Sequence, residues 1–139
     1  PIVRKAFSRT VSLKDSIDIN DCMTECYLTN NKYWNYEVLG RAEIKFLKYN
    51  TGGHYDWHID IGSHKHNNRK LAFVIPLSKP EDYEGGELII KTSSRESSIP
   101  LEQGKIILFP AFLLHKVTKV TQGKRYVIAG WLNGNQHFL

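Results

Sequence analysis

The residues with the clearest chemical potential in this chain are His58 and Asp60, two positions apart, and His115, far along the sequence. On a β-strand, residues at positions i and i+2 point to the same face. With a third ligand from a distant strand, such a pair can bind one side of a metal ion and leave three positions open. Two histidines and one carboxylate in this arrangement are typical of non-haem Fe(II), whose open positions can take a chelating organic cosubstrate and oxygen.

Arg125 lies ten residues after the distant histidine and adds to the same chemistry. A dicarboxylate that binds a metal through a keto acid at one end leaves its far carboxylate in need of a cation. A planar guanidinium can hold that group through paired hydrogen bonds. The chain also contains a competing pair, His54 and Asp56. Strand alternation places both pairs on the same face, so periodicity leaves the choice between them open.

Further motifs occur between residues 40 and 132. They comprise Tyr49, the run Gly53-His54-Tyr55-Asp56-Trp57-His58-Ile59-Asp60, Arg69 with the apolar segment 71–77, the run Tyr83-Glu84-Gly85-Gly86-Glu87-Leu88, Pro100, Gly104, Phe109-Pro110, His115 with Val117, Gly123, Arg125 and Trp131. Together these motifs resemble the Fe(II)- and 2-oxoglutarate-dependent oxygenases, most closely their prolyl 4-hydroxylase-like branch. In that family the first metal histidine lies three residues after a tyrosine, so the resemblance selects His58 and Asp60 over their competitors.

The resemblance implies a 2-oxoglutarate-dependent dioxygenase. His58, Asp60 and His115 would hold Fe(II), and Arg125 would hold the far carboxylate of 2-oxoglutarate. The cosubstrate would be cleaved to succinate and carbon dioxide while a substrate C–H bond is hydroxylated, with ascorbate as a candidate reductant.

Three aromatic residues have a functional and a structural interpretation. Tyr49 and Tyr55 resemble family tyrosines near the cosubstrate carboxylates or the substrate, although either would also suit a core position. Tyr55 is three residues from His58, so on a regular strand it would face away, and its role requires a bulge or an irregular strand start. Trp131 matches a family tryptophan, but a tryptophan on a final apolar strand is more typical of the core.

The substrate remains open among several classes. The resemblance favours a prolyl residue in a peptide or protein, followed by a free amino acid or another small molecule. A modified nucleic acid is a rival, but the demethylases of the superfamily resemble one another in a second arginine six residues after the first, where this chain has Trp131. A rival of another class is a metal- or sugar-binding jelly roll without oxygenase activity, in which Arg125 would be an incidental surface charge.

The elements that position these residues are predicted from patterning. Residues 12–31 predict a helix, with Asp18 or Asn20 as its cap. Its apolar face comprises Ile19, Cys22, Met23, Cys26 and Tyr27. Short strands are predicted at 43–49, 55–61, 70–77, 87–91, 105–109, 114–120 and 125–132. Seven or eight such strands fit a mainly β fold, a double-stranded β-helix of the jelly-roll or cupin type with a short N-terminal helical segment. Segment 62–69 is either a candidate lid over the site or a solvated loop.

Length and composition indicate a single domain, residues 1–139, with helical support at 12–31 and a barrel at about 40–132. The 139 residues are 41% hydrophobic, which is enough for one core and not for two. No apolar run approaches the ~20 residues that span a bilayer. The polar N-terminal segment does not suit a signal peptide. A cytoplasmic protein without membrane contact is therefore expected.

The charge and the cysteine content of the chain add little to the prediction of its function. The net charge of +5 is spread along the chain, which gives weak support for a nucleic-acid partner. Cys22 and Cys26 are expected to be reduced thiols, because four-residue spacing on a helix is a poor geometry for a disulfide. Little sequence precedes residue 40, so we expect a small or flexible substrate or a partner that completes the groove. The sequence does not specify the oligomeric state.

Overall fold

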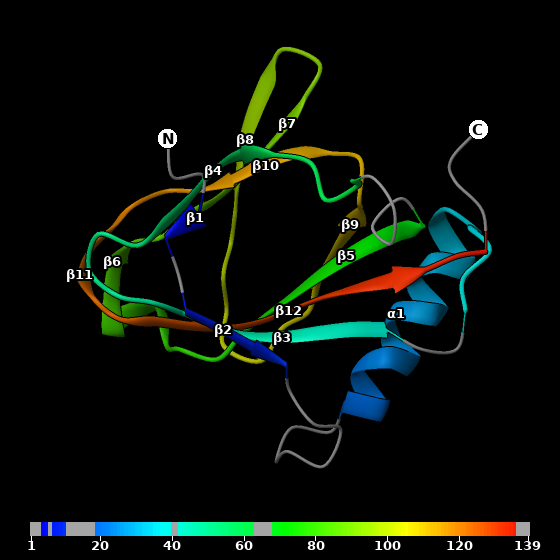
Figure 1. Ribbon diagram of the computed structural model, residues 1–139, viewed down its shortest axis with the longest axis horizontal. Coiled ribbons are helices and arrows are strands. Elements are labelled where there is room, and N and C mark those ends of the chain that lie inside the picture. The colour runs from blue at the N-terminus through cyan, green and yellow to red at the C-terminus, as the bar shows by residue number, and fades with distance from the viewer. Residues whose placement is uncertain (1–3, 6, 11–18, 40–41, 63–67, 136–139) are drawn as a thin grey trace.

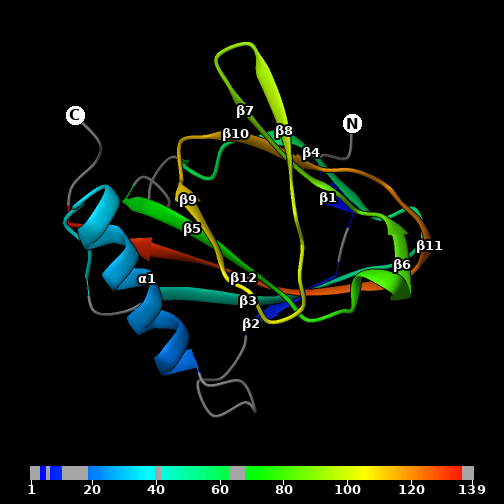
Figure 2. The ribbon, with the colours of Figure 1, turned by 180° about the vertical axis from the view of Figure 1, so that it is seen from behind.

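The described part of the chain folds into two facing five-stranded β-sheets, with the helix α1 against the outside. The computed structural model describes residues 4–5, 7–10, 19–39, 42–62 and 68–135. The described strands form two five-stranded sheets and one two-stranded sheet, and α1 (Ile19–Tyr33) lies against one end of the larger strands (Figures 1 and 2). This arrangement is the double-stranded β-helix predicted from the sequence.

The first sheet carries the core of the molecule. Its order is β2 (Phe7–Thr10), β3 (Ala42–Tyr49), β12 (Arg125–Asn133), β5 (Arg69–Pro76) and β9 (Ile107–Pro110), all antiparallel neighbours. Side chains alternate between its two faces, as a pleated strand requires. Leu71, Phe73 and Ile75 pack in the cluster that includes Cys26 of the helix. Ala72 packs in the second cluster, between the sheets.

The second sheet supplies the facing wall. Its order is β1 (Arg4–Lys5), β4 (His54–His58), β10 (Leu114–Val117), β7 (Leu88–Thr92) and β8 (Arg95–Ile99). The two-stranded sheet pairs β11 (Val120–Gly123) with β6 (Tyr83–Gly85), which follows the short 3-10 helix η2 (Pro80–Asp82).

The pairing of β4 with β10 is irregular, and this irregularity shapes the site. His58 lies opposite His115, and Tyr55 lies opposite Val117. One residue separates the two positions on β10, whereas two residues separate them on β4. The extra residue is a β-bulge, which reverses the alternation locally. Tyr55 and His58 therefore share a face despite their odd spacing.

The predicted helix is confirmed over its described residues, and it extends to Tyr33, two residues beyond the predicted end. Cys26 is buried, and Cys22, Met23 and Tyr27 pack beside it. Residues 12–18, including the candidate cap Asp18, lie outside the described residues. Asn20 lies inside the helix, so it is not the cap. No described helix is long and apolar enough to cross a membrane.

The predicted strands are recovered with several corrections. The strand expected at 55–61 ends at His58, and the strand expected at 114–120 is divided between β10 and β11. The expected seven or eight strands become twelve among the described residues, since β1, β2, β6 and β8 were not predicted. These four strands are short or polar, and they form only through pairing with other strands of the sheets. Of the candidate lid at 62–69, residues 63–67 lie outside the described part of the chain.

Candidate active site

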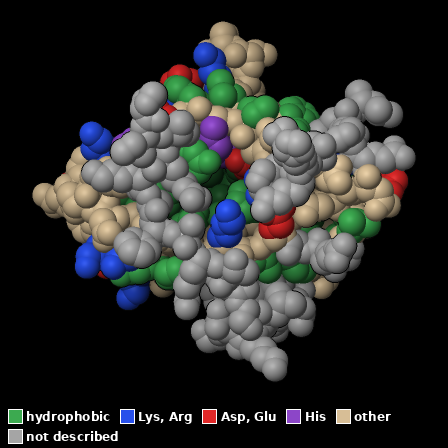
Figure 3. Space-filling view, in the orientation of Figure 1, with side chains coloured by type: hydrophobic (Ala, Val, Ile, Leu, Met, Phe, Trp, Pro, Cys, Tyr) green, Lys and Arg blue, Asp and Glu red, His purple; other side chains and the backbone are tan. Residues whose placement is uncertain are grey.

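A pocket of about 450 Å³ opens between the two larger sheets. It is lined by apolar side chains of both sheets and by the polar groups that the sequence singles out, including His58, Asp60 and His115. Figure 3 shows the hollow on one face of the molecule, with cationic, acidic and histidine side chains beside apolar ones. The pocket is a space in which a small ligand can be shielded from water.

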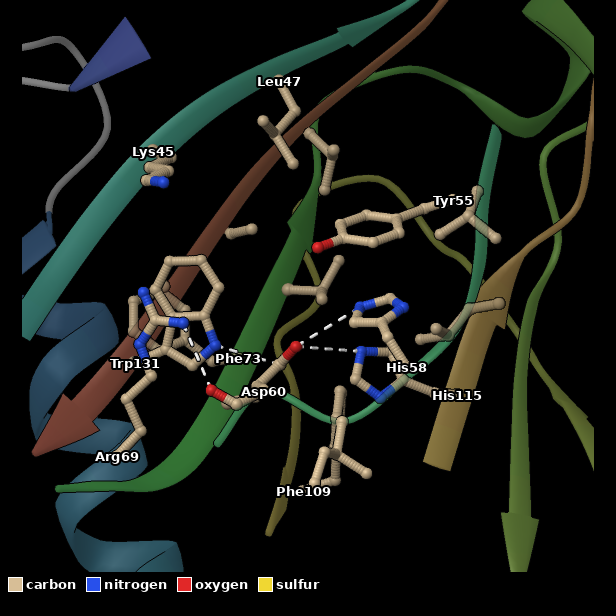
Figure 4. Close-up of a pocket in the computed structure, with 18 of the residues that line it drawn as sticks. Lys45, Leu47, Tyr55, His58, Asp60, Arg69, Phe73, Phe109, His115 and Trp131 are labelled. Carbon is tan, nitrogen blue, oxygen red and sulfur yellow. Dashed lines mark hydrogen bonds and ion pairs between the residues drawn. The ribbon is translucent and has the colours of Figure 1, made fainter. Parts of the chain in front are cut away.

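The structure brings His58, Asp60 and His115 together. Asp60 Oδ1 lies 3.3 Å from His58 Nε2 and 3.4 Å from His115 Nε2, and Figure 4 shows the three side chains converging. Their ligand atoms lie within 4.8 Å of one another. Two ligand atoms at right angles, each about 2.1 Å from a metal ion, are about 3 Å apart. The cluster is therefore close to the spacing that a metal ion needs.

Backbone carbonyls fix the orientation of both imidazole rings. His58 Nδ1 is 2.6 Å from the carbonyl oxygen of Asp56, and His115 Nδ1 is 2.8 Å from that of Leu113. A carbonyl oxygen can only accept, so Nδ1 of each ring carries a proton, and a ring that is neutral has its Nε2 lone pair available to a metal ion. Metal-binding histidines are oriented by such bonds. The donor set fits a divalent metal ion.

The ionisation of the cluster follows from its burial and mutual contacts. Burial raises the pKa of the Asp60 carboxyl, but hydrogen bonds from His115, His58 and Trp131 and the charge of His115 outweigh it, so the pKa is well below its usual range. Burial lowers the pKa of His115, but its hydrogen bond and attraction to Asp60 raise the net value. In the metal-free cluster, the contact with Asp60 therefore favours the protonated form of His115.

Tyr55 lies beside the cluster on the same wall. Its ring stacks on that of His58, with centroids 3.6 Å apart and an angle of 11° between the planes, and its hydroxyl points into the pocket in Figure 4. The bulge that this position requires is present in β4. Tyr55 is placed where it can contact a ligand.

Arg125 is not among the residues that line the pocket, but it is paired across the strands with Tyr49, which is. Its side chain is 2% exposed, and its guanidinium carbon is 5.1 Å from the centre of the Tyr49 ring. Among the described residues, its Nε and Nη1 have no hydrogen-bond partner. Buried donors normally have partners. This arginine is not an incidental surface charge, and its free donors suit an anion.

The competing pair is not part of the cluster. Asp56 is exposed and contributes its backbone carbonyl to His58, whereas His54 Nδ1 is 3.2 Å from the carbonyl oxygen of Gly52. Strand alternation alone would have placed all four side chains together. The β-bulge breaks that alternation and separates the pairs.

Trp131 agrees with both of its interpretations. It packs, partly buried, against the apolar cluster between the sheets. It also lines the pocket, and its Nε1 donates a 2.9 Å hydrogen bond to Asp60 Oδ2. Glu43 and Lys45 were missed altogether, although both precede Tyr49 at even spacing on β3. Charged residues on the inward face of an otherwise apolar strand are the signal that could have revealed them.

The fold and the cluster define a class: a double-stranded β-helix with a candidate two-histidine, one-carboxylate metal centre. The chain belongs to the 2OG-Fe(II) oxygenase superfamily, whose family model matches residues 44–133. This membership confirms the resemblance to the family.

Curated relatives carry the name PKHD-type hydroxylase. One from Prochlorococcus marinus (strain NATL1A) is 31% identical over 131 residues, which cover 94% of this chain and 59% of the relative. Another, from Prochlorococcus marinus (strain NATL2A), is 39% identical over 120 residues, which cover 86% of this chain and 54% of the relative. The chain thus spans little more than half the length of these relatives.

Solved structures share the fold at low sequence identity. A prolyl 4-hydroxylase of Pseudomonas putida superposes with a TM-score of 0.79 at 18% identity, over 96% of this chain and 74% of that chain. A Trichoplax adhaerens prolyl hydroxylase, solved in complex with a hypoxia inducible factor peptide fragment, gives a TM-score of 0.72 at 17% identity, over 94% and 64%. These likenesses support the double-stranded β-helix.

Proposed function

We propose that residues 1–139 form a single catalytic domain that uses Fe(II) and 2-oxoglutarate to hydroxylate a C–H bond, with a prolyl residue of a peptide or protein as substrate. One observation carries the proposal: a metal-ligand cluster and a buried arginine with free donors lie in one fold. An anion-binding cation is what a dicarboxylate cosubstrate requires in addition to the metal. A jelly roll that only binds a metal ion or a sugar does not require this buried arginine.

Each residue has a defined task in this proposal. Nε2 of His58, Nε2 of His115 and Oδ1 of Asp60 bind the metal, and the guanidinium of Arg125 binds the far carboxylate of the cosubstrate. When bound, Fe(II) and 2-oxoglutarate supply the oxidising power, with succinate and carbon dioxide as by-products and ascorbate as an auxiliary reductant. The apolar walls of the pocket exclude water.

Tyr49 and Tyr55 complete the cosubstrate site in this proposal. The Tyr49 ring packs beside the Arg125 guanidinium, so it lies next to the group that binds the far carboxylate. The Tyr55 hydroxyl points into the pocket from the side of His58, where it can bind cosubstrate or substrate.

Hydroxylation is supported by the names of the relatives, and a prolyl substrate by the fold shared with prolyl hydroxylases, one of them solved with a peptide. The pocket also has room for a free amino acid or another small molecule, which is the second candidate. A nucleic-acid substrate is disfavoured, because Trp131 occupies the position of the second arginine found in the demethylases and is engaged with Asp60.

The ligand assignment is tested by alanine substitution. Replacing His58, Asp60 or His115 should abolish tight Fe(II) binding and succinate release, whereas Asp56→Ala should preserve both. Metal binding is measured by competition with a chromogenic chelator, and folding by circular dichroism. An inactive Asp56→Ala protein beside an active Asp60→Ala protein would show that the wrong pair was chosen.

The substrate class is tested by coupling. Proline-containing peptides should stimulate succinate release above the background without substrate, and mass spectrometry should locate one added oxygen atom on proline. Free proline and alkylated single-stranded oligonucleotides serve as comparisons. Coupling by the oligonucleotides and not by any prolyl peptide would overturn the substrate assignment and leave the metal site intact.

A further inference from the structure

Asp60 is a metal-ligand candidate that no strand holds in place. The strand β4 ends at His58, so Asp60 lies just beyond the ladder. Its backbone N–H donates to the carbonyl oxygen of Ala111 at 2.9 Å, and its carbonyl oxygen accepts from Nη1 of Arg69 at 3.2 Å. These bonds hold the backbone on both sides but leave the side chain free to rotate. A further contact must fix the carboxylate.

The two carboxylate oxygens of Asp60 have different partners. Oδ1 faces the Nε2 atoms of His58 and His115. Oδ2 accepts the 2.9 Å hydrogen bond from Nε1 of Trp131. Figure 4 shows the carboxylate between the two imidazoles on one side and the indole on the other. The indole N–H thus holds Oδ2 away from the point where the ligand atoms converge.

The indole itself is firmly placed. Trp131 lies on the central strand β12, opposite Glu43 on one side and Ala72 on the other. The guanidinium carbon of Arg69 lies 3.8 Å from the centre of the indole ring. Glu43 binds this guanidinium at two points, Oε1 to Nε at 3.1 Å and Oε2 to Nη2 at 2.8 Å. An arginine held in this bidentate way is a rigid support for the ring.

We propose that Trp131 is a positioning residue that keeps Asp60 a one-oxygen ligand. The inference rests on the proposed Fe(II) site. A carboxylate can bind a metal through one oxygen or through both. Of six octahedral positions, three protein donors leave three, which suffice for a chelating cosubstrate and oxygen. A fourth donor, Oδ2, would leave only two. Because Oδ2 accepts the N–H of Trp131, it would be held away from the metal ion, and the third position would stay open.

Trp131→Phe separates this role from simple packing, because it keeps an aromatic ring under Arg69 and removes only the donor. Trp34→Phe is the matched control, since Trp34 packs on the helix side of the sheet. Mn(II) affinity and the affinity of the Fe(II)-loaded protein for 2-oxoglutarate are measured anaerobically. We expect 2-oxoglutarate affinity to fall by about 10- to 100-fold, the size of effect that losing a group behind a metal ligand has on metal affinity or activity. Mn(II) affinity should change by less than about tenfold, because the second carboxylate oxygen would add a bond to the metal ion.

A spectroscopic readout makes the test independent of turnover. The visible absorption of the Co(II)-substituted protein depends on the number and arrangement of ligands, so it should change in Trp131→Phe and not in Trp34→Phe. Unchanged 2-oxoglutarate affinity together with an unchanged Co(II) spectrum would overturn the role of Trp131. If the wild-type chain binds neither metal nor 2-oxoglutarate, the proposed function fails, and this inference fails with it.

A second variant guards against unfolding. Incorporation of benzothienylalanine at position 131 replaces the N–H by sulfur in a ring of nearly the same shape. Thermal denaturation establishes that the protein folds as the wild type does. If Trp131→Phe is unfolded, this variant decides: loss of 2-oxoglutarate affinity with an altered Co(II) spectrum supports the proposal, and wild-type values for both refute it.

Discussion

Replacing Arg125 with methionine should weaken 2-oxoglutarate binding without harming the fold. Methionine keeps the unbranched carbon chain and much of the volume, but it removes the cation. Truncating one partner of a buried, charged hydrogen-bonded pair costs about 2 to 5 kcal/mol. Since 1.4 kcal/mol is a tenfold change, the expected loss of affinity is about 30-fold to a few thousand-fold. With only 2% of the side chain exposed, solvent cannot replace the lost bonds.

The same substitution should have the opposite effect on the ligand-free protein. Two donors of Arg125, Nε and Nη1, lack partners among the described residues. A buried unsatisfied donor costs about 1 to 3 kcal/mol. Removing both should leave the melting temperature of the ligand-free protein unchanged or higher. The wild type, and not Arg125→Met, should then gain stability when 2-oxoglutarate is added.

Calorimetric titration of the metal-loaded protein and thermal denaturation with and without 2-oxoglutarate measure both effects. Arg95→Met is the control, because Arg95 is exposed on β8. Metal affinity should be unchanged in both variants. Wild-type 2-oxoglutarate affinity in Arg125→Met, accompanied by a lower ligand-free melting temperature, would mean that Arg125 is a structural residue and would remove the main support for 2-oxoglutarate.

Three further predictions follow from burial and charge. Asp60 raises the pKa of His115 above its ordinary value of 6.5. The pair should therefore stabilise the metal-free protein fully below about pH 6.5, and progressively less as the pH rises through the raised pKa. Over the same pH range the affinity for Mn(II) should rise by about tenfold per pH unit, because binding displaces one proton. Gly130→Ala should lower the free energy of unfolding by about 1 to 3 kcal/mol or more, the cost of overpacking, because the added Cβ would overlap the ring of Phe73. Urea denaturation measures this loss, and an unchanged midpoint would contradict the packing. Burial raises the pKa of Cys26 to about 12, so iodoacetamide at pH 8 should modify it only after unfolding, as peptide mass spectrometry can show.

The fold was predictable wherever local pattern and burial agree. Strand alternation assigns Leu71 and Phe73 to one face and Ala72 to the other, and the structure places them in two different apolar clusters accordingly. The strand β8 was not predictable, because its run of Arg95 to Ile99 is mostly polar and becomes a strand only through its ladder with β7. Strand formation depends on the partner more than on local propensity.

The sequence alone determined the chemistry available: two imidazoles, a carboxylate, a guanidinium, and the family in which they occur together. It did not determine which His-x-Asp pair converges with His115, because periodicity assigns a face and not a distance. Tertiary structure decided this through the β-bulge of β4 and the bond between Trp131 and Asp60. Both depend on how strands remote in sequence align. A shift of one residue in that pairing turns a side chain from the pocket to the opposite face.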